Sequence, residues 1–336
     1  PPQAEAANKA KYLTGSTMSH VINMTFTSAL GLIAVFSVDF VDLFFLSQLE
    51  DRAIQAALGF TGTILFTTVS VGIGFSIATS ATVSRAAGER DTEKTNRLTI
   101  NSLIYTAITA TIMAIILFLS VPALLELLGA KNHVLQLSIE YLYILVPTMP
   151  LFALSISSAA CLRALGDPVQ AVYVTLSGAF VNAALDPLLI FTFDMGMNGA
   201  AIASAAARVT MMLIGLYGLL VIHKTLTRPN LTHLKQDFRG FRRIAIPAIL
   251  TNLATPIGNG YVTYAAAPFG NSVIAAWAII TRLVPVAFAA VFALSGAVGP
   301  IMGQNLGGKQ YGRVKQTLMD AITFNTVYLL IIWAIL

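Results

Sequence analysis

The sequence has little charge and almost no cysteine. Only 10% of its 336 residues are Asp, Glu, Lys or Arg, against 56% hydrophobic residues, and its mean hydropathy is +0.77. Soluble domains carry about a quarter charged residues, so a soluble fold is excluded. The single cysteine, Cys161, excludes an internal disulfide. The sequence also shows no metal-ligand cluster, phosphate-binding loop or Cys–His pair, so neither an enzyme nor an ATP-driven pump is indicated.

Long apolar runs dominate the sequence instead. A membrane-spanning helix needs about 20 mainly apolar residues. Nine segments are predicted to span: 18–47, 54–84, 98–125, 134–160, 168–192, 198–222, 244–267, 272–302 and 317–336. The first run follows a polar segment, 1–17, and is too long for the core of a signal peptide, so we expect a retained first helix. The chain is predicted to be an all-α polytopic membrane protein.

Positive charge is distributed unevenly between the two sides of the predicted spans. With residue 1 in the cytoplasm, the N-terminus and alternate loops hold 16 of the 20 Lys and Arg residues, and the other side has only Arg52 and Lys131. Cytoplasmic loops carry this excess. We therefore expect a cytoplasmic N-terminus, and we interpret the basic stretch 224–243 as a cytoplasmic linker and not as a nucleic-acid site. Arg208 and Arg282 lie within spans, and Arg282 is predicted to be structural.

An internal repeat relates the two parts of the chain at an offset of 219 residues. The segment SRAAGER at 84–90 aligns with GQNLGGK at 303–309, so Gly88 aligns with Gly307 and Arg90 with Lys309. Six predicted spans separate equivalent positions, which indicates a parallel repeat about an axis along the membrane normal. This predicts an N-lobe of six helices at 18–223 and a partial C-lobe of about three helices at 244–336.

Acidic residues lie inside the predicted spans, where a carboxylate is costly and usually functional. Asp42 and Asp186 each lie about six residues from the outer end of an outward-running span, and Tyr141 and Ser204 lie at the same depth on inward-running spans. A second layer, one turn deeper on the same helix faces, is formed by three further residues: Asp39, Asn182 and Arg208. Depth therefore predicts a polar cluster within the N-lobe. Pro187, beside Asp186, removes a backbone donor and can bend its helix.

Several motifs resemble, in order and spacing, those of the multidrug and toxic compound extrusion (MATE) family. They are VDLFFLSQLE in the first span, SRAAGERDTEK and GQNLGGKQYGR after the second and eighth, CLRALGDP after the fourth and FVNAALDPLLIF in the fifth. The resemblance covers residue 18 to the end. It implies twelve helices in two six-helix lobes, the second incomplete here. It also implies a monomeric inner-membrane exporter of cationic or amphipathic compounds, driven by a proton gradient, or alternatively by sodium, with no cofactor.

The resemblance further implies a proton-responsive N-lobe network at matching positions: Asp42, Asn182, Asp186, Tyr141 and Ser204. We add Asp39 and Arg208 to this network only because of their depth in the membrane and the helix face on which they lie. The predicted seventh helix, 244–267, contains no acid, which favours the DinF-like branch, usually described as proton-coupled. Many relatives have a proline in the first half of helix 1, which is absent from 21–38. Bending at a proline is therefore doubtful in this chain, although Gly31 allows a softer bend.

The predicted mechanism is exchange by alternating access. Deprotonated carboxylates attract a cationic substrate from the cytoplasm, and protonation from outside weakens that attraction. Four alternatives remain open: a sodium-coupled exporter, a lipid-linked precursor flippase of the same fold group, a passive channel, or acids that serve only a static hydrogen-bond network. An intramembrane aspartyl protease is disfavoured, because Ala164 replaces the first glycine of its signature before Asp167.

Overall fold

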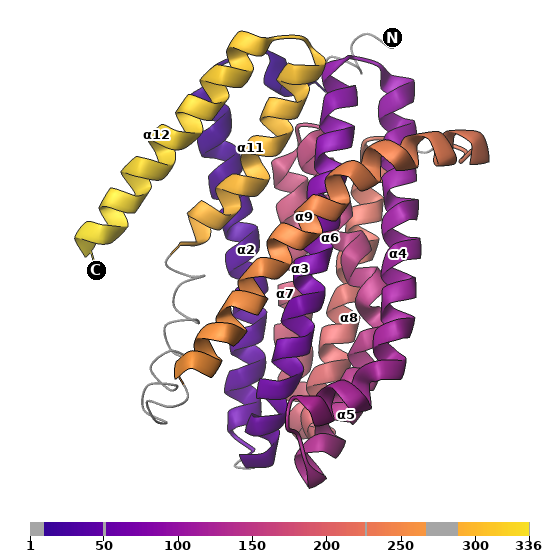
Figure 1. Ribbon diagram of the computed structural model, residues 1–336, viewed down its shortest axis with the longest axis vertical. Coiled ribbons are helices and arrows are strands. Elements are labelled where there is room, and N and C mark those ends of the chain that lie inside the picture. The colour runs from indigo at the N-terminus through magenta and orange to yellow at the C-terminus, as the bar shows by residue number, and fades with distance from the viewer. Residues whose placement is uncertain (1–9, 50–51, 226, 267–287, 336) are drawn as a thin grey trace.

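The computed structural model describes residues 10–49, 52–225, 227–266 and 288–335, and all the regular elements in these ranges are helical (Figure 1). The long helices are α2 (Thr17–Ser47), α3 (Arg52–Gly88), α4 (Thr92–Leu127), α5 (Asn132–Leu145), α6 (Met149–Ala164), α7 (Pro168–Pro187), α8 (Gly196–Tyr217), α9 (Leu231–Ala266), α11 (Ala289–Gly307) and α12 (Tyr311–Ile335). Shorter turns complete them: η1 (Lys11–Leu13), η2 (Val146–Thr148), and the π-helical η3 (Leu188–Thr192) and η4 (Gly218–Ile222).

Eight helical segments of the described part are long and apolar enough to cross a membrane, and each falls on a predicted span. The fourth span is α5 and α6 joined through η2. The seventh predicted span lies in α9, where several Asn, Thr, Gly and Pro residues lower the hydropathy. Residues 272–287 of the eighth predicted span, including Arg282, lie outside the described residues, as do residues 1–9 of the N-terminal segment.

Helix α9 begins inside the predicted linker. Leu234, Phe238, Phe241 and Ala245 recur at helical spacing, so the basic stretch also has an apolar face. Phe241 stacks on Phe75 of α3 with ring centroids 6.5 Å apart, and Leu234, Phe241 and Ala245 belong to one apolar cluster with α3 and α4. Residues 231–243 are therefore helical.

The helix ends confirm the internal repeat. Helices α3 and α11 end at Gly88 and Gly307, 219 residues apart. Two residues after these glycines, Arg90 and Lys309 adopt left-handed backbone angles with φ of 59° and 58°. We call α2–α8 the N-lobe and α9, α11 and α12 the C-lobe. We call the end of the molecule that holds η1 and the 89–91 and 308–310 turns the basic end (Figure 1).

The two lobes meet through a symmetric glycine crossing at the basic end. A Cβ atom at Gly88 would clash with the Gln304 carbonyl, and one at Gly307 would clash with the Arg85 carbonyl. Residues 85 and 304 are equivalent in the repeat, as are 88 and 307, so the two halves of the contact are related by it. Only residues without a side chain allow backbones to approach this closely.

Hydrogen bonds between polar side chains of the two lobes lie on either side of this crossing. Asp237 at the start of α9 accepts from Arg97 Nε at 3.1 Å and from Asn101 Nδ2 at 2.9 Å, both on α4. In the other copy, Thr17 at the start of α2 donates to Asp320 Oδ2 of α12 at 2.5 Å. The third helix of each lobe thus holds the start of the other lobe's first helix.

Asp167 of the ALGDP motif has a structural role. Its carboxylate caps α7 by accepting from Gln170 N at 3.0 Å, and it pairs with His223 Nε2 at 3.1 Å. The His223 hydrogen bond holds the pKa of Asp167 below its usual range. This carboxylate joins the α6–α7 turn to His223 at the end of η4, which gives the motif a structural role that involves no peptide cleavage.

Candidate functional site

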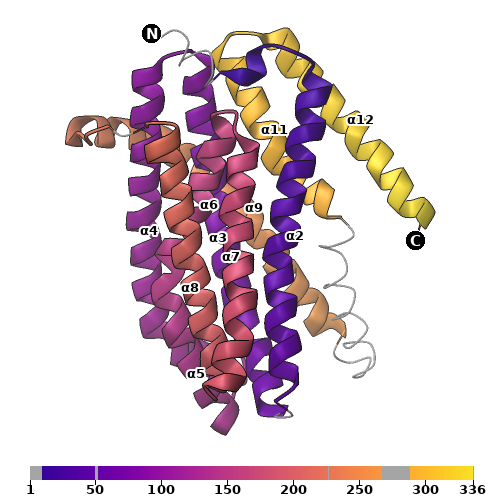
Figure 2. The same cartoon turned by 180° about the vertical axis from the view of Figure 1, so that it is seen from behind.

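Helices α2, α7 and α8 of the N-lobe lie side by side (Figure 2). Polar side chains from these three helices meet within the bundle. Ser204 Oγ of α8 donates to Asp42 Oδ2 of α2 at 3.3 Å, and Asn182 Nδ2 of α7 donates to Ser204 Oγ at 3.2 Å. Asp186 lies one turn after Asn182, and its carboxyl group interacts with that of Asp42. We call these four residues the acidic site. The depth argument places Asp42, Asp186 and Ser204 in one layer of the membrane and Asn182 one turn deeper.

The acidic site holds more buried acceptors than donors. Asn182 and Asp186 are fully buried, and Asp42 is 8% exposed. Four oxygens have no hydrogen-bond partner among the described residues: Asp42 Oδ1, Asn182 Oδ1, Asp186 Oδ1 and Asp186 Oδ2. Buried oxygens without partners cost free energy, and two adjacent carboxylates also repel each other. A proton shared by the carboxyl groups, or a small cation among these oxygens, would relieve both costs.

The backbone beside Asp186 is irregular. Pro187 has no N–H to donate, and α7 passes directly into the π-helical turn η3. Phe193 N bonds to Leu188 O, five residues earlier. Single π-helical turns occur frequently at functional sites, where they change the direction of neighbouring side chains.

An apolar cluster separates the acidic site from the end opposite the basic end. Leu46 and Ile190, each four residues beyond an acidic-site aspartate, are fully buried in this cluster. Tyr141 belongs to the same cluster and is 4% exposed. Its ring therefore helps to exclude water from that side of the acidic site.

Arg208 contacts the junction between α5 and α6. Its Nη1 atom donates to Leu145 O at 3.0 Å and to Thr148 Oγ1 at 2.9 Å, and its guanidinium lies 5.2 Å from the Phe152 ring centroid. Because Met149 N bonds to Val146 O in the 3-10 turn η2, Leu145 O lacks its α-helical partner. Arg208 compensates for this break between α5 and α6, which favours a structural role.

An Arg208→Gln variant tests this role. We expect it to lower stability by about 1.5–3 kcal/mol, because hydrogen bonds from a charged donor are lost. The pH at which transport is half-maximal should stay unchanged. Thermal unfolding in detergent and a pH profile of transport measure the two effects. A shifted pH midpoint would instead place Arg208 in the coupling machinery.

Two further acidic residues are relevant to the comparison between the predicted site and the structure. Asp39 lies in α2, but its side chain is outside the described residues, so its role stays a prediction. Sequence reasoning passed over Glu140, which accepts from Gln136 Nε2 at 3.0 Å and from Asn198 Nδ2 at 3.3 Å. The four-residue spacing of Gln136 and Glu140 was the available signal. These bonds tie α5 to the start of α8.

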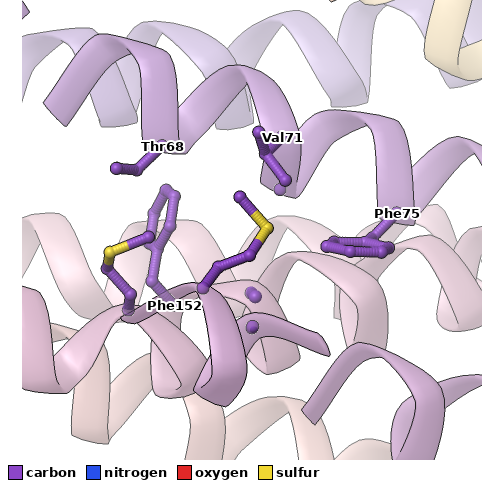
Figure 3. Close-up of a pocket in the computed structure, with 9 residues that line it drawn as sticks. Thr68, Val71, Phe75 and Phe152 are labelled. Atoms are coloured by element: carbon purple, nitrogen blue, oxygen red, sulfur yellow. The ribbon is translucent and has the colours of Figure 1, made fainter. Parts of the chain in front are cut away.

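A small apolar pocket lies elsewhere in the N-lobe. Figure 3 shows Thr68, Val71 and Phe75 of α3 facing Phe152 of α6 across it. Its free volume is about 10 Å³, roughly the space for one water molecule. This pocket cannot accept a drug-sized compound in the present conformation.

The fold and the site define a class of protein. Parallel repeats in a helical membrane protein, with a buried polar site in one lobe, are characteristic of secondary transporters. The chain belongs to the MatE family, whose model matches residues 28–188 and 247–336. It is accordingly a membrane transporter and not an enzyme.

Individual relatives agree with this assignment. The FAD transporter of Shewanella oneidensis is 28% identical over 316 residues, which are 92% of this chain and 69% of that protein. The multidrug export protein MepA of Staphylococcus aureus is 26% identical over 84% of this chain, which spans only 63% of MepA. The Vibrio cholerae MATE transporter VcmN superposes with a TM-score of 0.88 at 28% identity, covering 99% of this chain and 74% of VcmN.

Proposed function

We propose that this protein exports cationic or amphipathic compounds in exchange for protons. The acidic site is the observation that carries the proposal. Its four buried oxygens have no hydrogen-bond partner among the described residues, which makes the site an acceptor for protons. MepA, named as a multidrug exporter, supports the substrate class. The lack of an acid in residues 244–266, the membrane-spanning part of α9, supports the DinF-like branch. The transporter acts as a monomer in the inner membrane, with its basic end in the cytoplasm.

Protonation changes what the acidic site can hold. With both carboxyl groups charged, Asp42 and Asp186 repel each other and attract a cation. With a proton bound, they can share a hydrogen bond, so α2 and α7 can pack closely. A ligand shifts a conformational equilibrium only by its differential affinity for the two states. We therefore propose that the protonated site favours one lobe arrangement and the charged site favours the other.

Export assays in proteoliposomes test the coupling ion. A pH gradient across oriented vesicles containing the full-length protein should drive a fluorescent cationic dye, and collapse of that gradient should stop transport. A sodium gradient at equal pH on both sides should have no effect. Transport driven by sodium alone would overturn proton coupling, since carboxylate and amide oxygens also suit hard cations. Lipid scrambling without dye movement would instead favour a flippase.

A second substrate deserves the same assay, because the Shewanella oneidensis relative is named as a FAD transporter. FAD is anionic, whereas the acidic site attracts cations. A competition assay distinguishes the two candidate substrates, a cationic compound and FAD. Excess FAD should leave dye export unchanged if the substrate is cationic, and should inhibit it if flavin dinucleotides share the route.

A further inference from the structure

A short segment before α2 lies between the two lobes at the basic end. Tyr12, within η1, is only 2% exposed. Its hydroxyl donates to the Arg163 carbonyl of the N-lobe at 3.2 Å, and its backbone N–H donates to Gln304 Oε1 of the C-lobe at 2.9 Å. Gln304 also donates to the Ala164 carbonyl at 2.8 Å. One buried tyrosine thus bonds to both lobes.

The C-lobe surrounds this segment with side chains from α11 and α12. Asn305 Nδ2 donates to Tyr12 O at 3.2 Å. Arg313 donates to Tyr12 O at 3.0 Å and to Gly15 O at 2.9 Å, and its Nε donates to Asn305 Oδ1 at 2.9 Å. Hydrogen bonds from a charged guanidinium are stronger than those between neutral groups. The carbonyls of residues 12 and 15 are therefore held by a preorganised donor.

The internal repeat shows that this arrangement is not a general feature of the fold. At the positions equivalent to Gln304, Asn305 and Arg313, the N-lobe has other residues: Arg85, Ala86 and Lys94. Lys94 bonds to Glu89 of its own lobe at 2.6 Å. Leu231, the equivalent of Tyr12, is 77% exposed. In the part of the chain that the structure describes, only the C-lobe copy holds the segment before the other lobe's first helix.

We propose that residues 10–16 form a latch that holds the two lobes together at the basic end. The basic end opens only when this segment separates from Gln304, Asn305 and Arg313. The latch rests on the alternating-access function proposed above, because it controls the opening of one end. Burial raises the pKa of the Tyr12 phenol, so its hydroxyl remains a donor at physiological pH. The latch therefore stabilises the conformation in which the basic end is closed.

Cysteine accessibility tests the latch. With Cys161 replaced by alanine, Ile301→Cys provides a single thiol at a fully buried position in the apolar cluster that contains Tyr12 and α2 residues. A membrane-permeant maleimide labels this thiol only when the lobes separate. Arg313→Gln should raise the labelling rate at least about fivefold, the population change that loss of about 1 kcal/mol of hydrogen bonding produces. Lys94→Gln, at the equivalent position, should leave the rate unchanged.

A milder pair of variants protects the test against misfolding. Tyr12→Phe removes only the hydroxyl that bonds to Arg163, and should raise labelling by up to about fivefold. Tyr173→Phe, at a residue that is 54% exposed, is its control. Labelling rates that are equal in each variant and its control would overturn the latch. Because labelling needs neither drug nor gradient, failure of dye transport counts against the proposed function and not against the latch.

Discussion

Replacing Asp186 with asparagine is expected to reduce proton-driven export by roughly 100-fold, to near the background rate, with the fold intact. Asparagine is close in size to aspartate, so the surroundings of this fully buried side chain change little. It cannot take up or release a proton, and it removes the charge that repels Asp42. The coupling ion then has no differential affinity for the two lobe arrangements. Dye export driven by a pH gradient measures the loss, and thermal unfolding in detergent monitors the fold.

Asp42→Asn is expected to give a similar loss, because the two carboxyl groups interact and would share one proton. The double variant should then be no worse than either single variant, since both remove one unit. Asp194→Asn is the matched control: Asp194 is exposed in the turn between η3 and α8. Full gradient-driven export by either single variant would remove the acidic site from the mechanism.

The acidic site could be predicted from the sequence because depth is readable in a membrane helix. Counting residues from a span end fixes a layer, and spacing of three or four fixes a face. These two rules place Asp42, Asp186 and Ser204 in one layer and Asn182 one turn deeper, but they do not show that the side chains face each other. Neither rule gives the direction in which a helix face points within the bundle, so neither predicts that Arg208 donates to Leu145 and Thr148 where α5 and α6 meet.

The latch was beyond sequence reasoning for a related reason. Residues 10–16 are a short, mostly polar stretch, and nothing in them predicts burial. Tyr12 and Gln304 are 292 residues apart, so their contact exists only once both lobes have assembled. The start of α9 was missed because its basic residues concealed the apolar spacing that packs on Phe75. Local patterns thus predict helices and layers, whereas contacts between lobes require the assembled fold.

Alanine at either crossing glycine is expected to weaken the closed basic end strongly. A Cβ at Gly88 or at Gly307 would clash with a carbonyl of the facing helix, and backbone atoms cannot move aside as a flexible side chain can. Overpacking of this kind costs about 1–3 kcal/mol, which corresponds to a loss of roughly 5- to 150-fold in the closed population. Because the repeat relates the two contacts, Gly88→Ala and Gly307→Ala should have similar effects.

The same helices provide controls for this crossing. A Cβ at Gly62 of α3 or Gly299 of α11 would meet no atom within 4 Å, so alanine there should be tolerated. Maleimide labelling at Ile301→Cys and dye export should both respond to Gly88→Ala and Gly307→Ala, with faster labelling and slower export. If labelling and export stay at control values, the crossing does not hold the basic end closed. A response at only one of the glycines would mean that the two lobes contribute unequally, despite the symmetric contact between their backbones.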